Sequence, residues 1–158
     1  MLDRKLRMGM VGGGKDAFIG AIHRIAANMD GLIELACGAL SINREIAIDS
    51  GKSLFLPADR IYLTYDEMIT KESKLSSDKR IDFVTIVTPN FAHFAPAVMA
   101  LENGFNVVIE KPITFTLDEA KQLTRSDLLN AIGGLPSRKH HAAALAIETL
   151  NSALVQLS

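Results

Sequence analysis

The sequence is short of cysteine, of long apolar segments and of net charge, and each shortage excludes a class of protein. Cys37 is the only cysteine among the 158 residues, so no intrachain disulfide is expected and a reducing cytoplasm is favoured. The longest apolar stretch, residues 94–101, contains a proline and falls far short of the roughly 20 residues that span a bilayer. Lys plus Arg number 17 and Asp plus Glu 18, and this balance gives no electrostatic reason to expect nucleic acid or a membrane as partner.

What remains is an ordinary globular composition, 48% hydrophobic and 22% charged, in which short apolar segments alternate with helical patterns. Strands are predicted near residues 6–11, 33–40, 61–63, 81–88 and 106–110. The apolar residues predicted to share one face of the first helix are Phe18, Ile22, Ile25, Ala26 and Met29. This alternation predicts a Rossmann-like, doubly wound parallel α/β sheet with strand order 3-2-1-4-5.

Local signals set the ends of several predicted helices. Gly51 is expected to end the helix that begins near residue 43, and Asn90 is expected to be the N-cap of the helix after the fourth strand. Thr116 and Glu119 have the spacing of a capping box and predict a helix that continues through residue 123.

Residues 124–158 differ in style, because two helices are predicted there with no further strand. The second helix carries an apolar stripe at Ala143, Ile147, Leu150, Leu154 and Leu157. Such a stripe needs a partner, so this tail is expected to pack on the α/β domain of residues 1–123 and not to form an independent domain. Exchange of the last helix between two copies would give a homodimer.

Gly12, Gly14 and Ala17 form a G-x-G-x-x-A pattern between the first predicted strand and a helix. In this context the first glycine permits a tight turn, the second lets a pyrophosphate approach, and Ala17 lets the helix pack closely. The free N–H groups at the helix start then favour a phosphate. A plain glycine turn without a ligand is the alternative interpretation.

Ser41 and Arg44 lie where NAD sites normally carry an acidic residue. A hydroxyl and a guanidinium suit a 2′-phosphate better than a carboxylate would, which favours NADP over NAD. The alternative for Arg44 is an ordinary solvated helix residue.

Four motifs follow one another along the first 123 residues. They are V-G-G-G-K-D-A-F-I-G-x-x-H-R at residues 11–24, G-A-L-S at 38–41, V-T-P-N at 87–90 with His93, and E-K-P at 110–112. Between about residues 7 and 123 the chain therefore resembles the glucose–fructose oxidoreductase/inositol dehydrogenase (Gfo/Idh/MocA) family. The resemblance implies an NAD(P)-dependent oxidoreductase of two domains that acts mostly on sugars or cyclitols.

The resemblance and the patterns above together give a set of expected cofactor-binding residues. These are Gly12, Gly14, Ala17, Ser41, Arg44, Thr88, Pro89, Asn90 and Glu110. Lys111 is implied to lie beside the nicotinamide and the substrate, as a vestigial catalytic residue that donates a proton or stabilises an alkoxide. An exposed surface lysine is the alternative for Lys111, and His93 is assigned no chemistry.

Residues 127–158 depart from the family, which continues with a further strand and a second domain carrying the substrate pocket. Their G-G-L-P turn, followed by a Lys, a His and an Ala-rich helix, resembles the C-terminal helices of U-type iron–sulfur cluster assembly scaffolds. Those scaffolds carry a ligating cysteine after the motif histidine, whereas here His141 is followed by Ala142. Neither a metal nor an iron–sulfur cluster is therefore expected.

The sequence thus predicts a truncated or chimeric NAD(P)-binding module of a Gfo/Idh/MocA-type oxidoreductase. Because the substrate domain is absent from the pattern, cofactor binding without turnover is expected. The alternative is a structural chimera without a ligand, whose tail helices cap the sheet or mediate dimerisation. A cluster-assembly scaffold fails on the number of cysteines.

Overall fold

Four short apolar segments form one parallel sheet in the computed structural model, which describes residues 4–116, 118 and 119. The strands are β1 (Leu6–Gly12), β2 (Ile33–Ala39), β3 (Phe83–Val87) and β4 (Asn106–Ile109), in the order β2-β1-β3-β4. The α-helices are α1 (Phe18–Asn28), α2 (Arg44–Ser53), α3 (Tyr65–Ser73) and α4 (Phe94–Glu102). Two short 3-10 helices are η1 (Ala58–Arg60) and η2 (Asn90–Ala92). Every strand pair is parallel, which confirms the predicted fold class.

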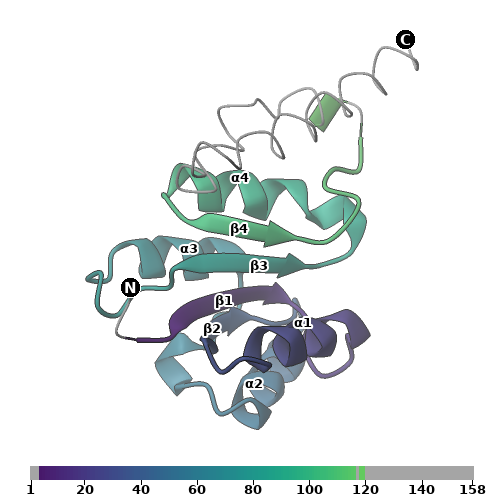
Figure 1. The fold of residues 1–158 in the computed structure, drawn as a ribbon. Helices are drawn as coiled ribbons and strands as arrows, with labels where there is room; N and C mark the ends of the chain where they lie inside the picture. The colour runs from purple at the N-terminus through teal and green to yellow at the C-terminus, as the bar shows by residue number, and fades with distance from the viewer. Residues whose placement is uncertain (1–3, 117, 120–158) are drawn as a thin grey trace.

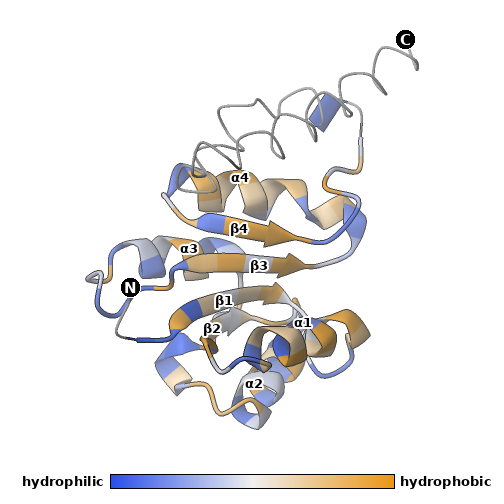
Figure 2. Cartoon of the chain, in the orientation of Figure 1, coloured by the Kyte–Doolittle hydropathy of each residue, from blue (hydrophilic) through white to orange (hydrophobic). Residues whose placement is uncertain are grey.

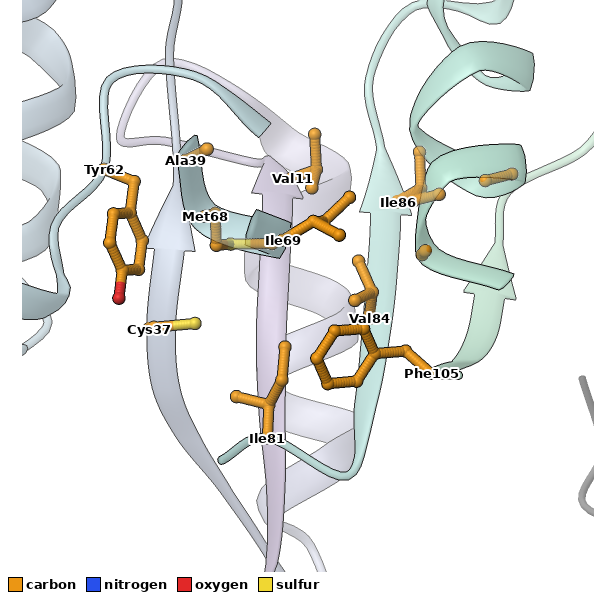
Figure 3. Packing of buried hydrophobic residues seen from close by; sticks show 12 residues of the cluster. Val11, Cys37, Ala39, Tyr62, Met68, Ile69, Ile81, Val84, Ile86 and Phe105 are labelled. Carbon is orange, nitrogen blue, oxygen red and sulfur yellow. The ribbon is translucent and has the colours of Figure 1, made fainter. Parts of the chain in front are cut away.

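Helices cover both faces of the sheet (Figure 1). Because successive side chains of a strand point to opposite faces, the sheet contributes apolar side chains to a separate core on each side. On one face Val84 and Ile86 of β3 pack with residues of α3 and α4 around Phe105 (Figure 3). On the other face Met8 and Met10 of β1 pack with residues of α1 and the chain after α2. The apolar character of β3 and α4 is visible in Figure 2. Each such buried side chain stabilises the fold by about 1.5–3 kcal/mol.

The third predicted strand, residues 61–63, is reduced to a single bridge. Ile61 pairs in parallel with Gly38 of β2, and the Tyr62 N–H donates to the Gly38 carbonyl oxygen at 2.9 Å. This bridge lies beside β2, so the predicted order 3-2-1-4-5 holds although no strand forms there. The reason is local: the Thr64 side chain already caps α3, which turns the chain away from the sheet.

The apolar face predicted for the first helix does not face the sheet. Phe18, Ile22, Ile25 and Met29 are exposed by 80%, 43%, 63% and 78%. Gly20 is instead the buried residue of α1, and Ile19 and Ala27 of the same helix pack against the core. The helix is turned this way because its backbone contacts the glycine turn after β1 at Gly20, as shown below.

Two predicted helix ends are wrong. Gly51 lies inside α2, where a Cβ would collide with the Ile61 side chain, and the helix continues to Ser53. Asn90 opens η2, and the N-cap position of α4 belongs to His93, whose side chain makes no capping bond. In both places a tertiary contact decides the local geometry.

The capping box at the end of the described chain is formed. Glu119 Oε2 accepts from the Thr116 N–H at 3.0 Å, and Thr116 Oγ1 accepts from the Glu119 N–H at 3.2 Å. The predicted helix to residue 123, the tail of residues 124–158 and its stripe lie outside the described residues. Within the described part of the chain no helix is long and apolar enough to cross a membrane.

Candidate functional site

The turn after β1 is shaped by glycines. Gly12 and Gly13 have φ values of 80° and 72°, a left-handed conformation that glycine adopts at little cost. A Cβ on Gly12 would lie 3.0 Å from the carbonyl oxygen of Val87 at the end of β3. The turn therefore passes against the end of the neighbouring strand, and a side chain at Gly12 would push it away.

Gly14 fixes the same turn to its other neighbour, β2. Its N–H donates to the Leu40 carbonyl oxygen at 3.0 Å, and the next N–H, of Lys15, donates to Ser50 Oγ of α2 at 3.0 Å. A Cβ on Gly14 would lie 2.8 Å from that Leu40 oxygen and 2.9 Å from Ser50 Oγ. The space that a side chain at Gly14 would need is thus filled by the protein itself.

The close approach of α1 to the turn depends on Gly20. A Cβ at this position would overlap the backbone of Gly13, so no other residue type fits without moving the helix. Ala17, which sequence reasoning assigned to this packing, is the N-cap residue, and its N–H donates to the Gly14 carbonyl oxygen at 2.9 Å. The sequence signal for the real contact was the glycine three positions further on.

The start of α1 has neither a side-chain cap nor an acidic residue in its first turn. N–H groups in a first turn have no partner within their helix, and the helix dipole adds partial positive charge there. Beside this helix start lies a surface pocket of about 170 Å³, lined by Gly14, Asp16, Ala17, Leu40, Ser41 and Ile46. The helix start would favour an anionic group of a ligand in this pocket.

A second, mainly apolar pocket of about 280 Å³ lies at the carboxyl ends of β1 and β2. Gly12, Ser41 and Thr88 all line it, together with Tyr65 at the start of α3. The carboxyl ends of parallel strands are where ligands of open α/β sheets bind, at the point where the strand order reverses. Here β1 is that point, because it pairs with β2 on one side and β3 on the other.

The E-K-P segment follows β4 and is tied to α1. The His23 ring, at Nε2, lies 2.7 Å from Glu110 Oε1, and Glu110 Oε2 accepts from the Lys111 N–H at 3.1 Å. The bond to His23, followed by the Lys111 N–H, holds the pKa of Glu110 below its usual value. Glu110 is therefore a carboxylate that joins the glycine-turn helix to the segment carrying Lys111.

Comparison with known proteins identifies the family of this chain. The model of the Gfo/Idh/MocA family, described as an oxidoreductase family with an NAD-binding Rossmann fold, matches residues 6–126. The chain belongs to the Gfo/Idh/MocA family. It is 37% identical over 124 residues to the uncharacterized oxidoreductase YfiI of Bacillus subtilis, a match that covers 78% of this chain and 31% of that protein.

Two solved structures extend the Gfo/Idh/MocA comparison to three dimensions. An oxidoreductase from Sinorhizobium meliloti is 47% identical with a TM-score of 0.71, covering 76% of this chain and 33% of that one. An inositol dehydrogenase homolog from Azotobacter vinelandii, complexed with NADH and myo-inositol, is 37% identical with a TM-score of 0.74, covering 84% and 34%. The chain thus spans about a third of the length of these relatives.

In this Gfo/Idh/MocA domain the predicted site residues fall into separate groups. Gly12, Ser41 and Thr88 share one pocket. Arg44 lines a different groove, with Ile48 and Lys52 of α2, so the structure does not bring it into the pocket of Ser41. Ser41 Oγ also accepts from the Asn43 N–H at 3.1 Å, which holds the turn before α2.

The remaining predicted residues lie along the loops after β3 and β4. Pro89 and Asn90 are exposed and do not line the pocket that contains Thr88. Lys111 is also exposed, whereas Glu110 is partly buried. Its exposure leaves Lys111 accessible from solvent.

Sequence reasoning missed three residues that hold these loops. The Arg24 guanidinium donates to the Gly13 carbonyl oxygen at 2.6 Å, and burial lowers the pKa of Arg24. His23 binds Glu110, and His93 is fully buried between the loops after β3 and β4. Their motif positions were visible in the sequence, but only the fold shows what each side chain reaches. No group of three or more His, Cys, Asp or Glu in the described part of the chain could hold a metal ion.

Proposed function

We propose that this NAD-binding oxidoreductase domain binds its dinucleotide with the pyrophosphate over Gly12 to Gly14 and the start of α1. The observation that carries the proposal is the first turn of α1, which has neither a side-chain cap nor an acidic residue, set against a glycine turn that leaves no room for side chains. The adenosine half would occupy the pocket of Ser41 and Thr88. The nicotinamide half would extend toward Glu110, with Pro89 and Asn90 along the cleft.

When bound, the nicotinamide supplies hydride transfer to or from a substrate carbon. Lys111 is the residue of this chain that we assign to the accompanying proton: its ammonium would donate a proton to a developing alkoxide, and in the reverse direction its neutral amine would take the proton from the substrate hydroxyl. The substrate class we propose for the longer enzyme is a sugar or cyclitol. The complex of the Azotobacter vinelandii relative with NADH and myo-inositol supports this choice.

We propose that residues 1–158 alone bind the cofactor without turnover. Hydride transfer needs donor and acceptor held in near-attack geometry. Lys111 is exposed, so the described residues would contact a substrate beside Lys111 on one side only and leave its other side open to solvent. Reduction of NAD(P)⁺ by the isolated chain with sugars or polyols, abolished in Lys111→Ala, would contradict this proposal.

A negative charge introduced at the start of α1 gives the decisive test of binding. Phe18 is the first residue of α1 and is exposed, so Phe18→Asp adds a negative charge there without removing packing. Asp in the first turn favours the helix itself, whereas its like charge beside a bound pyrophosphate should weaken binding by on the order of tenfold. Phe18→Asn is the matched neutral control.

The measurement is the dissociation constant for NADH by fluorescence, together with the melting temperature with and without cofactor. A cofactor at 100 times its dissociation constant should stabilise the fold by about 2.7 kcal/mol. Phe18→Asp should raise the melting temperature of the free protein and weaken binding, and Phe18→Asn should do neither. Equal NADH affinities for the two variants would show that the start of α1 does not contact the pyrophosphate.

For the cofactor type we propose NADP over NAD, on the basis of Ser41 and Arg44. Arg44 is exposed at the first position of α2, three residues after Ser41. Arg44→Ala should weaken NADP⁺ binding more than NAD⁺ binding. Equal affinity for both cofactors before and after the substitution would contradict this preference.

A structural role is the second candidate function, and the exposed apolar stripe of α1 favours it. Phe18, Ile22, Ile25 and Met29 form this stripe in the described part of the chain. We propose that the chain covers apolar surface by its tail or by a second copy. Deletion of residues 124–158 should then lower the melting temperature or cause aggregation. A truncated chain that remains monomeric and equally stable would contradict this role.

A further inference from the structure

The segment that carries Lys111 is held at both of its ends by histidines from different elements. On the Glu110 side, His23 of α1 contributes a contact of 2.7 Å to the carboxylate. The same carboxylate accepts from the Lys111 N–H, so the bond to α1 extends to the lysine backbone. His23 and Glu110 are partly buried, with side-chain exposures of 22% and 24%, which limits screening of this pair by water.

On the Pro112 side, the imidazole of His93 lies between two backbone carbonyls. Nδ1 is 2.8 Å from the Pro112 oxygen, and Nε2 is 2.8 Å from the Thr88 oxygen. Carbonyl oxygens only accept hydrogen bonds, so the ring serves here as donor: a neutral imidazole donates to one of them and a protonated one to both. His93 is completely buried, so this link joins the loop after β3 to the segment after β4 away from competing water.

We propose that His23 and His93 are positioning residues that fix the backbone of Lys111 in the cofactor cleft. Each acts through a neighbour of Lys111, one through Glu110 and the other through Pro112, and neither is assigned contact with the reacting atoms. Pre-ordering of a loop reduces the entropy that a ligand must offset on binding. The two histidines should therefore strengthen binding of the nicotinamide half and leave the adenosine half unaffected. This inference rests on the proposed function.

Two probes separate a local role from a structural one. NADH carries the nicotinamide, whereas ADP-ribose contains the adenosine and pyrophosphate without it. The variants are His93→Gln and His23→Gln, whose amides can replace one hydrogen bond each but not the geometry of the ring. Dissociation constants for both probes, measured on the 158-residue chain, are compared with melting temperatures.

Matched controls remove similar bonds far from the Lys111 segment. Tyr62→Phe removes a buried hydrogen bond of 2.8 Å to Glu72, as a counterpart of His93. Lys71→Gln removes an ion pair of 2.7 Å with Glu67, as a counterpart of His23. Both controls should leave the ratio of the NADH and ADP-ribose dissociation constants within about twofold, since neither bond contacts the Lys111 segment.

Each histidine variant should weaken NADH binding by about fivefold or more, the equivalent of one lost hydrogen bond, and change ADP-ribose binding by less than about twofold. In a Glu110→Gln background the effect of His23→Gln should vanish, because its partner is already altered. Equal weakening of both probes, or unchanged NADH binding, would overturn the proposal. If His93→Gln fails to fold, the proposal is tested by His23→Gln alone, together with its double-mutant cycle with Glu110→Gln. Failure of the unaltered chain to bind either probe would instead contradict the proposed function.

Discussion

At the scale of single residues, the glycines of the turn after β1 are constrained by protein more than by ligand. A Cβ on Gly14 would lie 2.8 Å from the Leu40 carbonyl oxygen, and a larger side chain would have to enter the region of Ser50. We therefore predict that Gly14→Val destabilises the fold by about 1–3 kcal/mol and loses cofactor binding through displacement of the turn. The measurement is denaturant unfolding beside NADH titration.

The control for this substitution is Gly31→Ala, where a Cβ would meet nothing within 4 Å and only the φ of 67° opposes it. That variant should retain cofactor binding. A Gly14→Val chain of unchanged stability that still fails to bind NADH would show that the valine blocks the ligand directly.

A second residue-scale prediction concerns acid stability. Asp82 accepts two bonds from the Arg4 guanidinium, at 2.7 and 2.9 Å, and one from the Arg7 N–H at 2.8 Å. The bond to Arg4, followed by the bond from the Arg7 N–H, holds the pKa of Asp82 below its usual value of 3.8 although partial burial opposes this. A carboxyl whose pKa is lower in the folded state stabilises the fold above its unfolded pKa.

This stabilisation should be complete above about pH 5 and be lost as the pH falls below about 4 through the folded-state pKa. Asp82→Asn should be less stable than the unaltered chain at pH 7, and the difference should shrink toward pH 3. Melting temperatures at several pH values check this. A difference in melting temperature that stays constant with pH would show that the charge of Asp82 does not cause it.

At the scale of elements, η1, α3 and the entry to β3 are joined by one buried carboxylate. Glu72 is fully buried, accepts from Tyr62 Oη at 2.8 Å and from Arg60 at 2.7 Å, and so fixes α3 beneath the sheet. Removal of one partner of a buried ion pair leaves the other charge uncompensated. Glu72→Ala should therefore destabilise the fold by about 3–5 kcal/mol.

The matched control is Glu34→Ala, which breaks a more exposed pair with Arg7 at 3.7 Å and should cost less than about 1 kcal/mol. Urea unfolding measures both variants. Burial, and after it the charge of Glu72, raises the pKa of the Cys37 thiol, so this cysteine should react with a thiol reagent only when the chain unfolds. Equal losses for the two glutamates would mean that the buried pair adds nothing.

The position of an element could be predicted from the sequence where its apolar pattern determines which residues are buried. It could not be predicted where a single tertiary contact determines how the element is oriented. The strands β1, β2 and β3 follow from apolar runs that the sheet buries in whole or in part, and β4 follows from an apolar run at the sheet edge, where Val108 remains exposed. The orientation of α1 does not, because one backbone contact between Gly20 and Gly13 outweighs the larger apolar stripe of the helix. The role of His93 was equally hidden, since its two partners are carbonyls 5 and 19 residues away.

At the scale of the whole molecule, the apolar stripe of α1 is open to association. Ile22 and Ile25 are exposed, so the double variant Ile22→Gln/Ile25→Gln should change the unfolding free energy by no more than about 0.5 kcal/mol per substitution. It should also reduce binding of a hydrophobic dye and self-association measured by ultracentrifugation. The buried Ile69→Gln is the contrasting variant and should unfold the chain. Loss of stability in the double variant would show that the stripe is already covered.

The position of β1 between β2 and β3 has a consequence for synthesis on the ribosome. β1 is made before both of its neighbours in the sheet, and the second of them, β3, ends only at Val87. Parallel pairing with β3 joins residues about 75 positions apart, such as Met8 and Phe83, and long separations of this kind slow folding. A nascent chain therefore carries the half-paired β1, with the glycine turn attached, until β3 is complete. During that interval the side of β1 that later pairs with β3 is an unpaired strand edge. Chaperones and neighbouring nascent chains can bind this edge in place of β3.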